Sequence, residues 1–127
     1  MRKHFLIALT VILPLFLTNC SPGAMEKELI VGNWQAVDVE EEGEALLINP
    51  KEIKLTFTEE EKYYYQSTLN YQEAGSYYID TKYLFTIDTL NKASTEKAVE
   101  IITLSTDSLC LKMNDNGRER LLKMVKI

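Results

Sequence analysis

The sequence has almost no histidine and very little cysteine. Its 127 residues include one histidine, His4, and two cysteines, Cys20 and Cys110. His4 lies in an N-terminal segment that we expect to be removed, so the mature chain would have no imidazole. That absence excludes histidine general bases, Ser-His and Cys-His nucleophile pairs, and most zinc sites. The composition therefore predicts a protein that is not an enzyme, and it indicates neither a metal nor a cofactor.

The sequence also lacks an excess of positive charge. Nineteen acidic residues outnumber fourteen basic ones, for a formal net charge of −5. Removal of Arg2 and Lys3 with the N-terminal segment would make the chain more acidic still. Because an acidic protein of this size is a poor phosphate binder, the composition argues against nucleic acid as a partner.

The apolar run near the N-terminus is too short to cross a membrane as a helix. The stretch Phe5–Leu17, broken at Thr10 and Pro14, would be about 20 Å long as a helix, whereas the hydrocarbon core is ~30 Å thick. A basic start precedes the stretch. This combination is typical of a secretory signal peptide, to which we assign residues 1–19.

The expected signal ends in Leu17–Cys20, with the sequence Leu-Thr-Asn-Cys, which resembles the lipobox of bacterial lipoproteins. The resemblance implies that Cys20 is acylated, becomes the first mature residue and anchors the protein to a membrane. The alternative is an ordinary secretory signal with a cysteine at its cleavage site. Residues 20–28 would form a lipidated tether. Ser21 does not resemble an inner-membrane retention signal, so we expect the outer membrane of a bacterial cell envelope; the side that the domain faces stays open.

Cys110 has no disulfide partner in the chain if Cys20 carries the lipid. It lies in a strand-like run, Ser108–Lys112. Because no histidine is available to activate it, we interpret Cys110 as a small packing residue and not as a nucleophile.

From residue 30 onward the sequence has no helical periodicity and is typical of consecutive β-strands. Short apolar runs alternate with turn-like clusters, a pattern that indicates an all-β sandwich or barrel. The expected strands are 30–39, 53–57, 62–69, 75–80, 82–90, 98–105, 108–113 and 118–127.

The connections between these strands favour antiparallel neighbours. Most are short, and Asn116-Gly117 is typical of a type I′ hairpin turn. Sequential antiparallel strands leave no unpaired edge when the sheet closes. We therefore predict an all-β fold, an eight-stranded antiparallel up-and-down β-barrel over residues 29–127.

The connection between residues 40 and 51 is longer than the others. It is acidic at first and then apolar at Leu46-Leu47-Ile48. Apolar side chains in a loop must pack somewhere, so this segment is either a lid over one mouth of the barrel or a short extra strand.

Four short motifs resemble the lipocalins and the shorter bacterial lipocalin-like lipoproteins. They are G-x-W at Gly32 and Trp34, L-x-F at Leu55–Phe57, G-x-Y-x-I at Gly75–Ile79, and L-S-x-D-x-L-x-L at Leu104–Leu111. In such barrels the tryptophan is a structural plug of the closed end and the glycine leaves room for a close approach. The resemblance implies these roles for Trp34 and Gly32.

Tyrosines are the candidate ligand contacts. All seven lie between residues 63 and 83, and strand alternation separates Tyr63 and Tyr65 from Tyr64, and Tyr77 from Tyr78. We take Tyr63, Tyr65 and Tyr77 as candidate ligand-binding residues inside the barrel. The alternative is that tyrosines simply fill a small barrel, whose interior holds at most one small ligand.

Two classes of function remain open at this point. One is a lipid-anchored barrel that binds a small hydrophobic ligand without catalysis. The other is an envelope protein-binding module, such as a protease inhibitor that inserts its N-terminal segment into an active site. The residues between Ser21 and Leu29 would be that segment.

The lipid anchor is tested by replacing the acylated residue. Cys20→Ser should release the protein from membranes into the soluble fraction, because two or more acyl chains supply the whole attachment. Fractionation of cells followed by immunoblotting measures this. A variant that stays with the membrane would contradict the lipobox interpretation.

Overall fold

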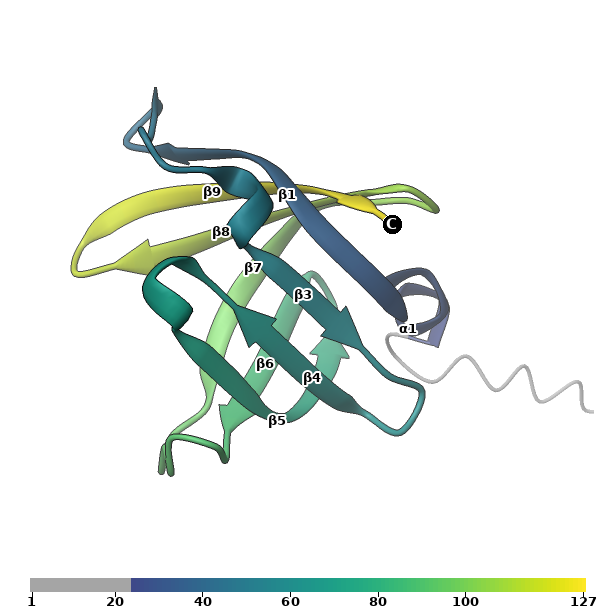
Figure 1. The fold of residues 1–127 in the computed structure, drawn as a ribbon. Coiled ribbons are helices and arrows are strands. Elements are labelled where there is room, and N and C mark those ends of the chain that lie inside the picture. The colour runs from purple at the N-terminus through teal and green to yellow at the C-terminus, as the bar shows by residue number, and fades with distance from the viewer. Residues whose placement is uncertain (1–23) are drawn as a thin grey trace, which may run out of the picture.

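The computed structural model describes residues 24–127, which form a closed antiparallel β-barrel preceded by one short helix, α1 (Ala24–Ile30) (Figure 1). The expected signal peptide, residues 1–19, and Cys20 lie outside the described residues. The strands are β1 (Gly32–Glu41), β2 (Glu44–Ala45), β3 (Lys54–Phe57), β4 (Lys62–Gln66), β5 (Gln72–Asp80), β6 (Tyr83–Asp88), β7 (Lys97–Leu104), β8 (Ser108–Asp115) and β9 (Arg118–Lys126). Within residues 24–127 no helix is long and apolar enough to span a membrane.

Pairing between the first and last strands closes the barrel. Strands β3 to β9 each pair with the next in chain order, and β1 pairs with β3 on one side and β9 on the other. The β1–β9 register runs from Trp34 opposite Lys126 to Glu41 opposite Arg120. Apart from the two-residue β2, the barrel has the eight strands expected from the sequence, with ends shifted by a few residues. The predicted fold class is confirmed.

The predicted hairpin turn is also present. Asn116 and Gly117 both have positive φ, 52° and 83°, between β8 and β9. Positive φ at both central residues is the requirement of a type I′ turn, whose twist matches that of the flanking strands.

The long connection after β1 contains an extra strand, one of the two expected alternatives. Glu44 and Ala45 of β2 pair with the end of β1. A 3₁₀ helix, η1 (Pro50–Glu52), follows, with Asn49 accepting a hydrogen bond from the Lys51 amide.

A bulge in β1 changes which residues face inward. The register with β9 shifts between Ala36 and Asp38. Alternation already points Val37 outward, where it is 53% exposed, and the shift then turns Val39 to the buried side with Trp34 and Ala36. Strict alternation from Trp34 would have turned Asp38 inward, so the bulge keeps a carboxylate out of the core.

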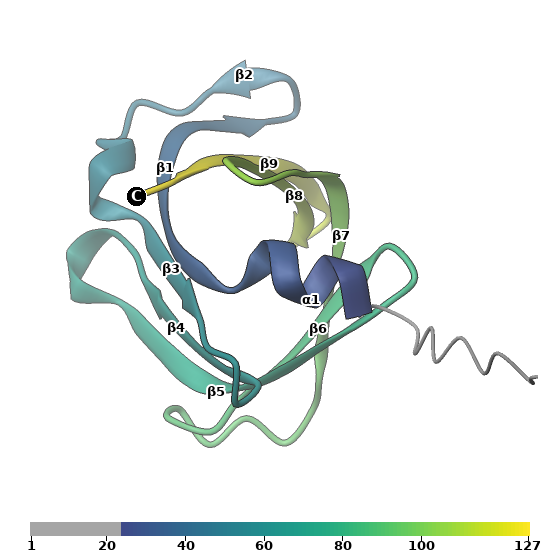
Figure 2. The same ribbon diagram turned by 90° about the vertical axis from the view of Figure 1, so that its right-hand side faces the viewer.

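Trp34 lies at the end of the barrel that α1 covers. Its side chain is fully buried, as is Ile30 at the end of α1. The indole Nε1 donates a hydrogen bond to the Ile30 carbonyl oxygen at 2.8 Å. Viewed toward this end, α1 lies across the barrel opening (Figure 2). The part of the expected tether that the structure describes, residues 24–28, is therefore helical.

Gly32 makes room for Lys126 at the same end. Gly32 has a φ of +140°, and a Cβ there would lie 3.1 Å from the Lys126 Cε. The lysine Nζ lies 5.0 Å from the Trp34 ring centroid and donates to the Leu29 carbonyl oxygen at 3.0 Å. A cation over an indole face is attracted to it, so this lysine connects β9, α1 and the tryptophan.

Removal of the tryptophan should be costly. Trp34→Ala should lower the free energy of unfolding by about 3–5 kcal/mol, because it leaves a cavity under α1. Urea unfolding measures the change. The matched control is Val37→Ala on the outer face of the same strand, which should stay within about 0.5 kcal/mol of the parent. Equal effects of the two substitutions would contradict the packing described here.

A candidate ligand-binding cavity

The barrel interior contains a cavity of about 380 Å³. It lies toward the end away from α1, since Arg120, which pairs with the far end of β1, is part of its lining. Ligand sites in proteins usually measure ~300–1,000 Å³, so the cavity is large enough for one small molecule. The apolar part of the lining comes from five strands: Leu55, Phe57, Leu84, Val99, Leu111, Met113 and Leu122.

Two of the three candidate tyrosines line this cavity. Tyr63 and Tyr65 on β4 both face it. Tyr77 on β5 also points inward and is buried, but it is absent from the lining. Its ring packs edge-on against Phe57 at 4.8 Å between centroids, and its hydroxyl donates to the Thr58 carbonyl oxygen at 2.9 Å. Tyr77 therefore belongs to the packed core beside the cavity.

The other tyrosines of these strands point outward, as alternation predicts. Tyr64 and Tyr78 are 54% and 46% exposed. Tyr78 stacks on Phe85 of the neighbouring strand, with 4.9 Å between ring centroids. Tyr71, in the connection before β5, is an addition to the expected set because it too lines the cavity.

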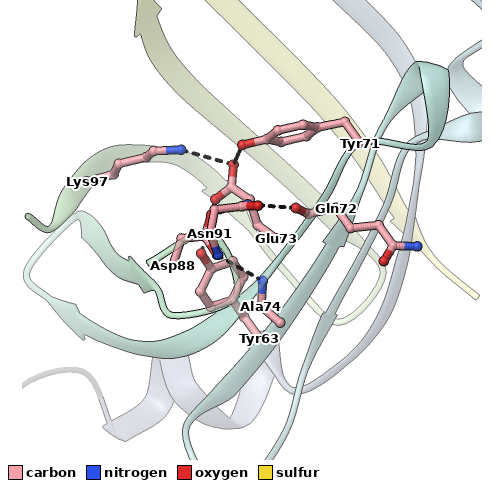
Figure 3. A network of polar contacts seen from close by, with 8 residues as sticks. All are labelled: Tyr63, Tyr71, Gln72, Glu73, Ala74, Asp88, Asn91 and Lys97. Carbon is pink, nitrogen blue, oxygen red and sulfur yellow. Dashed lines mark hydrogen bonds and ion pairs between the residues drawn. The ribbon is translucent and has the colours of Figure 1, made fainter. Parts of the chain in front are cut away.

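A nearly buried carboxylate, Glu73, lies in the cavity wall (Figure 3). Its Oε1 accepts a hydrogen bond from the Tyr63 hydroxyl at 3.1 Å. Its Oε2 accepts from the Tyr71 hydroxyl and from the Lys97 ammonium, both at 2.9 Å. Glu73 thus connects β4, β5, β7 and the turn before β5, and its charge is compensated by Lys97.

These tyrosines keep their protons at physiological pH. Burial raises the pKa of Tyr63 well above its usual value, and the neighbouring Glu73 carboxylate raises it further. Burial and the hydrogen bond to Glu73 raise the pKa of Tyr71 to about 12. Burial raises the pKa of Tyr77 to about 12 as well. Each hydroxyl therefore keeps the proton that it donates to Glu73 or to the Thr58 carbonyl oxygen.

A second carboxylate, Asp88, holds the connection between β6 and β7 (Figure 3). Burial alone would raise its pKa, but hydrogen bonds from the Asn91 side chain, the Asn91 amide and the Ala74 amide lower it. The Asn91 side chain also donates to the Gln72 carbonyl oxygen at 2.9 Å. This loop is thereby attached to the start of β5, next to Glu73.

Arg120 on β9 occupies another part of the lining. Its guanidinium lies 3.2 Å from Asp115 Oδ2 and 3.5 Å from Glu41 Oε1. The Nε of Arg120 is buried and has no hydrogen-bond partner among residues 24–127. A buried donor without an acceptor is unfavourable, and this one belongs to a residue of the cavity wall.

A smaller recess of about 170 Å³ adjoins the cavity. The two share Tyr65, Ser67, Met113, Arg120 and Leu122 in their linings. Leu46 and Ile48, from the connection after β2, complete the recess. Of the three apolar residues in the 40–51 connection, Leu46 packs against the core beside the cavity, whereas Leu47 is fully exposed.

Cys110 lies on β8, partly buried. Burial raises its thiol pKa, which Lys123 opposes and Glu40 reinforces. A thiol with a raised pKa is a weak nucleophile at neutral pH.

Three charged residues of the lining were not among the residues expected from the sequence: Glu73, Lys97 and Arg120. The signal for Glu73 is its spacing, because it precedes Tyr77 by four residues and therefore shares its inward face. Arg120 is likewise two residues from the buried Leu122. Charged residues at expected interior positions are the pattern to look for, since such positions need a partner or a ligand.

Comparisons with known proteins show which solved structures this architecture resembles. No protein-family model matches the chain, and no curated protein matches it. Among solved structures, a lipocalin-like protein from Bacteroides uniformis is similar, with a TM-score of 0.60 and 14% identity over 77% of this chain and 98% of that one. The protein has a lipocalin-like fold.

A second solved structure agrees with this result. An uncharacterized protein from Bacteroides eggerthii matches the lipocalin-like barrel with a TM-score of 0.54 and 16% identity, over 77% of this chain and 99% of that one. At such low identity the likeness concerns the fold alone, and the resemblance expected from the four sequence motifs is confirmed at that level.

The lining of the lipocalin-like barrel is suited to non-covalent binding. Its walls are mostly apolar, and its polar groups are mainly ion-paired or hydrogen-bonded to one another. Within residues 24–127, no three histidine, cysteine or acidic side chains are grouped to hold a metal ion.

The raised tyrosine pKa values predict alkaline destabilisation. An unfolded tyrosine ionises near pH 10, whereas Tyr63 stays protonated in the fold, so its contribution is complete below pH 10 and declines above it. Above pH 10 the free energy of unfolding should fall as the pH rises, by at most about 1.4 kcal/mol per pH unit from this residue. Tyr63→Phe should flatten the slope by that amount in urea titrations. An unchanged slope would contradict the burial of this hydroxyl.

Proposed function

We propose that this protein is a lipid-anchored barrel of the bacterial cell envelope that binds a small, mostly apolar ligand without catalysing a reaction. The cavity of about 380 Å³, formed between strands of the barrel and lined largely by apolar side chains, carries the proposal. A fully packed barrel would have left no room for a ligand.

The proposed anchor would fix the orientation of the barrel relative to the membrane. The start of α1 at Ala24 is only four positions after Cys20, and four residue steps span at most about 14 Å. Because α1 covers the closed end, this end would face the membrane that holds the anchor, which we propose to be the outer membrane. The cavity would then open away from that membrane, toward molecules in the adjoining compartment.

The absence of catalysis is proposed from the side chains available. His4 is the single histidine of the sequence. In the cavity, Glu73 receives three hydrogen bonds and Lys97 is paired with it at 2.9 Å. A carboxylate held in this way is a structural element and a poor general base, because its lone pairs are occupied.

The position of the helix α1 argues against the protein-binding alternative. An inhibitor of the expected kind would insert residues 21–29 into an enzyme, but residues 24–29 belong to α1. Lys27 forms an ion pair with Glu61 at 3.2 Å, and Ile30 is fully buried. Insertion would require this helix to unwind, so the geometry supports the ligand proposal better.

Native mass spectrometry tests the proposal. Protein extracted gently from membranes should carry an additional mass of a few hundred daltons. Val99→Trp, which adds volume inside the cavity, should lose that mass, because the ligand and the indole cannot share the space. The matched control is Val37→Trp on the outer face of β1, which should keep it.

Two results would contradict the proposal. One is an unmodified mass together with no saturable binding of an uncharged apolar dye. The other is a ligand mass that Val99→Trp leaves unchanged while the variant remains folded by circular dichroism, since the ligand would then lie outside the cavity.

A further inference from the structure

Glu73 is a fixed negative charge in the wall of the cavity. Its side chain is 9% exposed, and the hydroxyls of Tyr63 and Tyr71 donate to it at 3.1 and 2.9 Å. The register of β4 with β5 also places Tyr65 directly opposite Glu73. A carboxylate held out of water in this way needs a cation beside it, because an uncompensated buried charge is costly.

Lys97 supplies that cation, and it is the exchangeable member of the pair. Its Nζ lies 2.9 Å from Glu73 Oε2, yet its side chain is 56% exposed. Lys97 and Tyr71 approach the carboxylate from different sides (Figure 3), so the lysine can leave while the tyrosine stays. A lysine on a flexible, exposed stem can turn into water at small cost, because its ammonium is strongly hydrated there.

The other cation of the cavity lining is committed elsewhere. The Arg120 guanidinium lies 3.2 Å from Asp115 Oδ2 and 3.5 Å from Glu41 Oε1. Among residues 24–127, Lys97 is the single ion-pair partner of Glu73. When Lys97 turns outward, the compensating charge therefore has to come from a ligand.

Tyrosine rings line the cavity together with this carboxylate. Tyr63, Tyr65 and Tyr71 all belong to the lining, and the rings of Tyr65 and Tyr71 meet edge to face, with 6.2 Å between centroids and 70° between planes. An ammonium group is attracted to the faces of aromatic rings, and it forms strong hydrogen bonds with a carboxylate. Several aromatic rings beside one buried carboxylate therefore suit an organic ammonium group.

The charge balance disfavours the other head groups. A ligand carboxylate could pair with Lys97 only by taking it from Glu73, which would leave that buried charge without a cation. A neutral ligand would leave the ion pair as it is and gain no charged contact from it. An ammonium takes the place of the lysine and keeps the balance.

The apolar wall begins one level below the lysine. Lys97 pairs with Thr86 on β6, and the next inward-facing pair of these strands, nearer the closed end, is Val99 with Leu84. Both Val99 and Leu84 line the cavity. A ligand whose ammonium lies at Glu73 therefore has apolar side chains against its body.

We propose that the ligand is an amine with an apolar body, and that its ammonium group replaces that of Lys97 at Glu73. The inference rests on the proposed ligand-binding function and specifies the class of ligand. Lys97 occupies the position of the ammonium while the barrel is empty and turns outward when an amine enters. Glu73 then determines the specificity for the head group, whereas Val99, Leu84 and the rest of the apolar wall supply affinity for the body.

Matched eight-carbon probes test the choice of head group. The full mature chain is loaded with the uncharged dye N-phenyl-1-naphthylamine, which is displaced by octylamine, octan-1-ol or octanoate at pH 7.5. Octylamine is protonated at this pH, as lysine is. It should displace the dye at about tenfold lower concentration than octan-1-ol, because it adds a charged contact with Glu73. Octanoate should be the weakest competitor.

Two lysine variants separate a specific exchange from a general charge effect. Lys97→Met keeps the apolar stem and removes the competing ammonium, so octylamine should bind about tenfold more tightly while octan-1-ol is unchanged. Lys82→Met is the matched control. Lys82 also pairs with a glutamate, Glu100 at 3.2 Å, but it lies outside the cavity lining. This control should leave all three probes unchanged.

A third variant tests the carboxylate itself. Glu73→Gln keeps an oxygen that accepts from the tyrosines and removes the negative charge. Octylamine and octan-1-ol should then displace the dye at the same concentration. Circular dichroism verifies that each variant is folded.

The outcomes separate this inference from the proposed function. Equal displacement by octylamine and octan-1-ol in the unmodified chain, or an amine preference that survives Glu73→Gln, would overturn the head-group assignment while dye binding still supports a ligand cavity. Weaker octylamine binding in folded Lys97→Met, or the same gain in Lys82→Met, would also overturn it. Absence of dye binding in the unmodified chain would overturn the proposed function and this inference with it.

Discussion

The pairing of β1 with β9 is the constraint on which the rest of the structure depends. Without it the sheet would have two free edges and no interior, and the side chains that now enclose a cavity would face water. The bulge beside Val37 is part of this closure, because it lets β1 follow β9 while Val39 stays inside. Ion pairs such as Lys123 with Glu40 cross the same seam at 3.1 Å, although exposed pairs add little stability.

The two ends of the barrel differ because different side chains fill them. At the α1 end the fully buried Trp34 fills the interior, and Phe57 and Tyr77 pack against each other. At the other end the inward residues, which include Tyr65 and Arg120, leave space between them. Charged residues are tolerated there because they pair with one another, as Glu73 does with Lys97. A barrel of this size can therefore be both firmly packed and partly hollow.

Much of the fold could be predicted from the sequence, whereas the candidate site could be predicted only in part. Period-two alternation and turn residues predicted eight strands in the right order. Alternation also predicted that Tyr63 and Tyr65 share one face of their strand, and the structure turns that face inward, toward the cavity. The spacing of Glu73 and Arg120 indicates that they face inward, but it does not indicate which residues on other strands they pair with. Tyr77 faces inward as alternation requires, yet its depth along the barrel puts it in the packed core.

The sequence by itself determined the strand order, the direction in which most side chains point and the residue types inside, because alternation and turn chemistry are local properties. Tertiary structure alone decided how far each strand is staggered against its neighbours. That stagger sets which inward residues share a level of the barrel, and so it brings Arg120 beside Glu41, places Tyr71 beside Glu73, and leaves the cavity at one end. Contacts between residues far apart in the chain exist only once the barrel has closed.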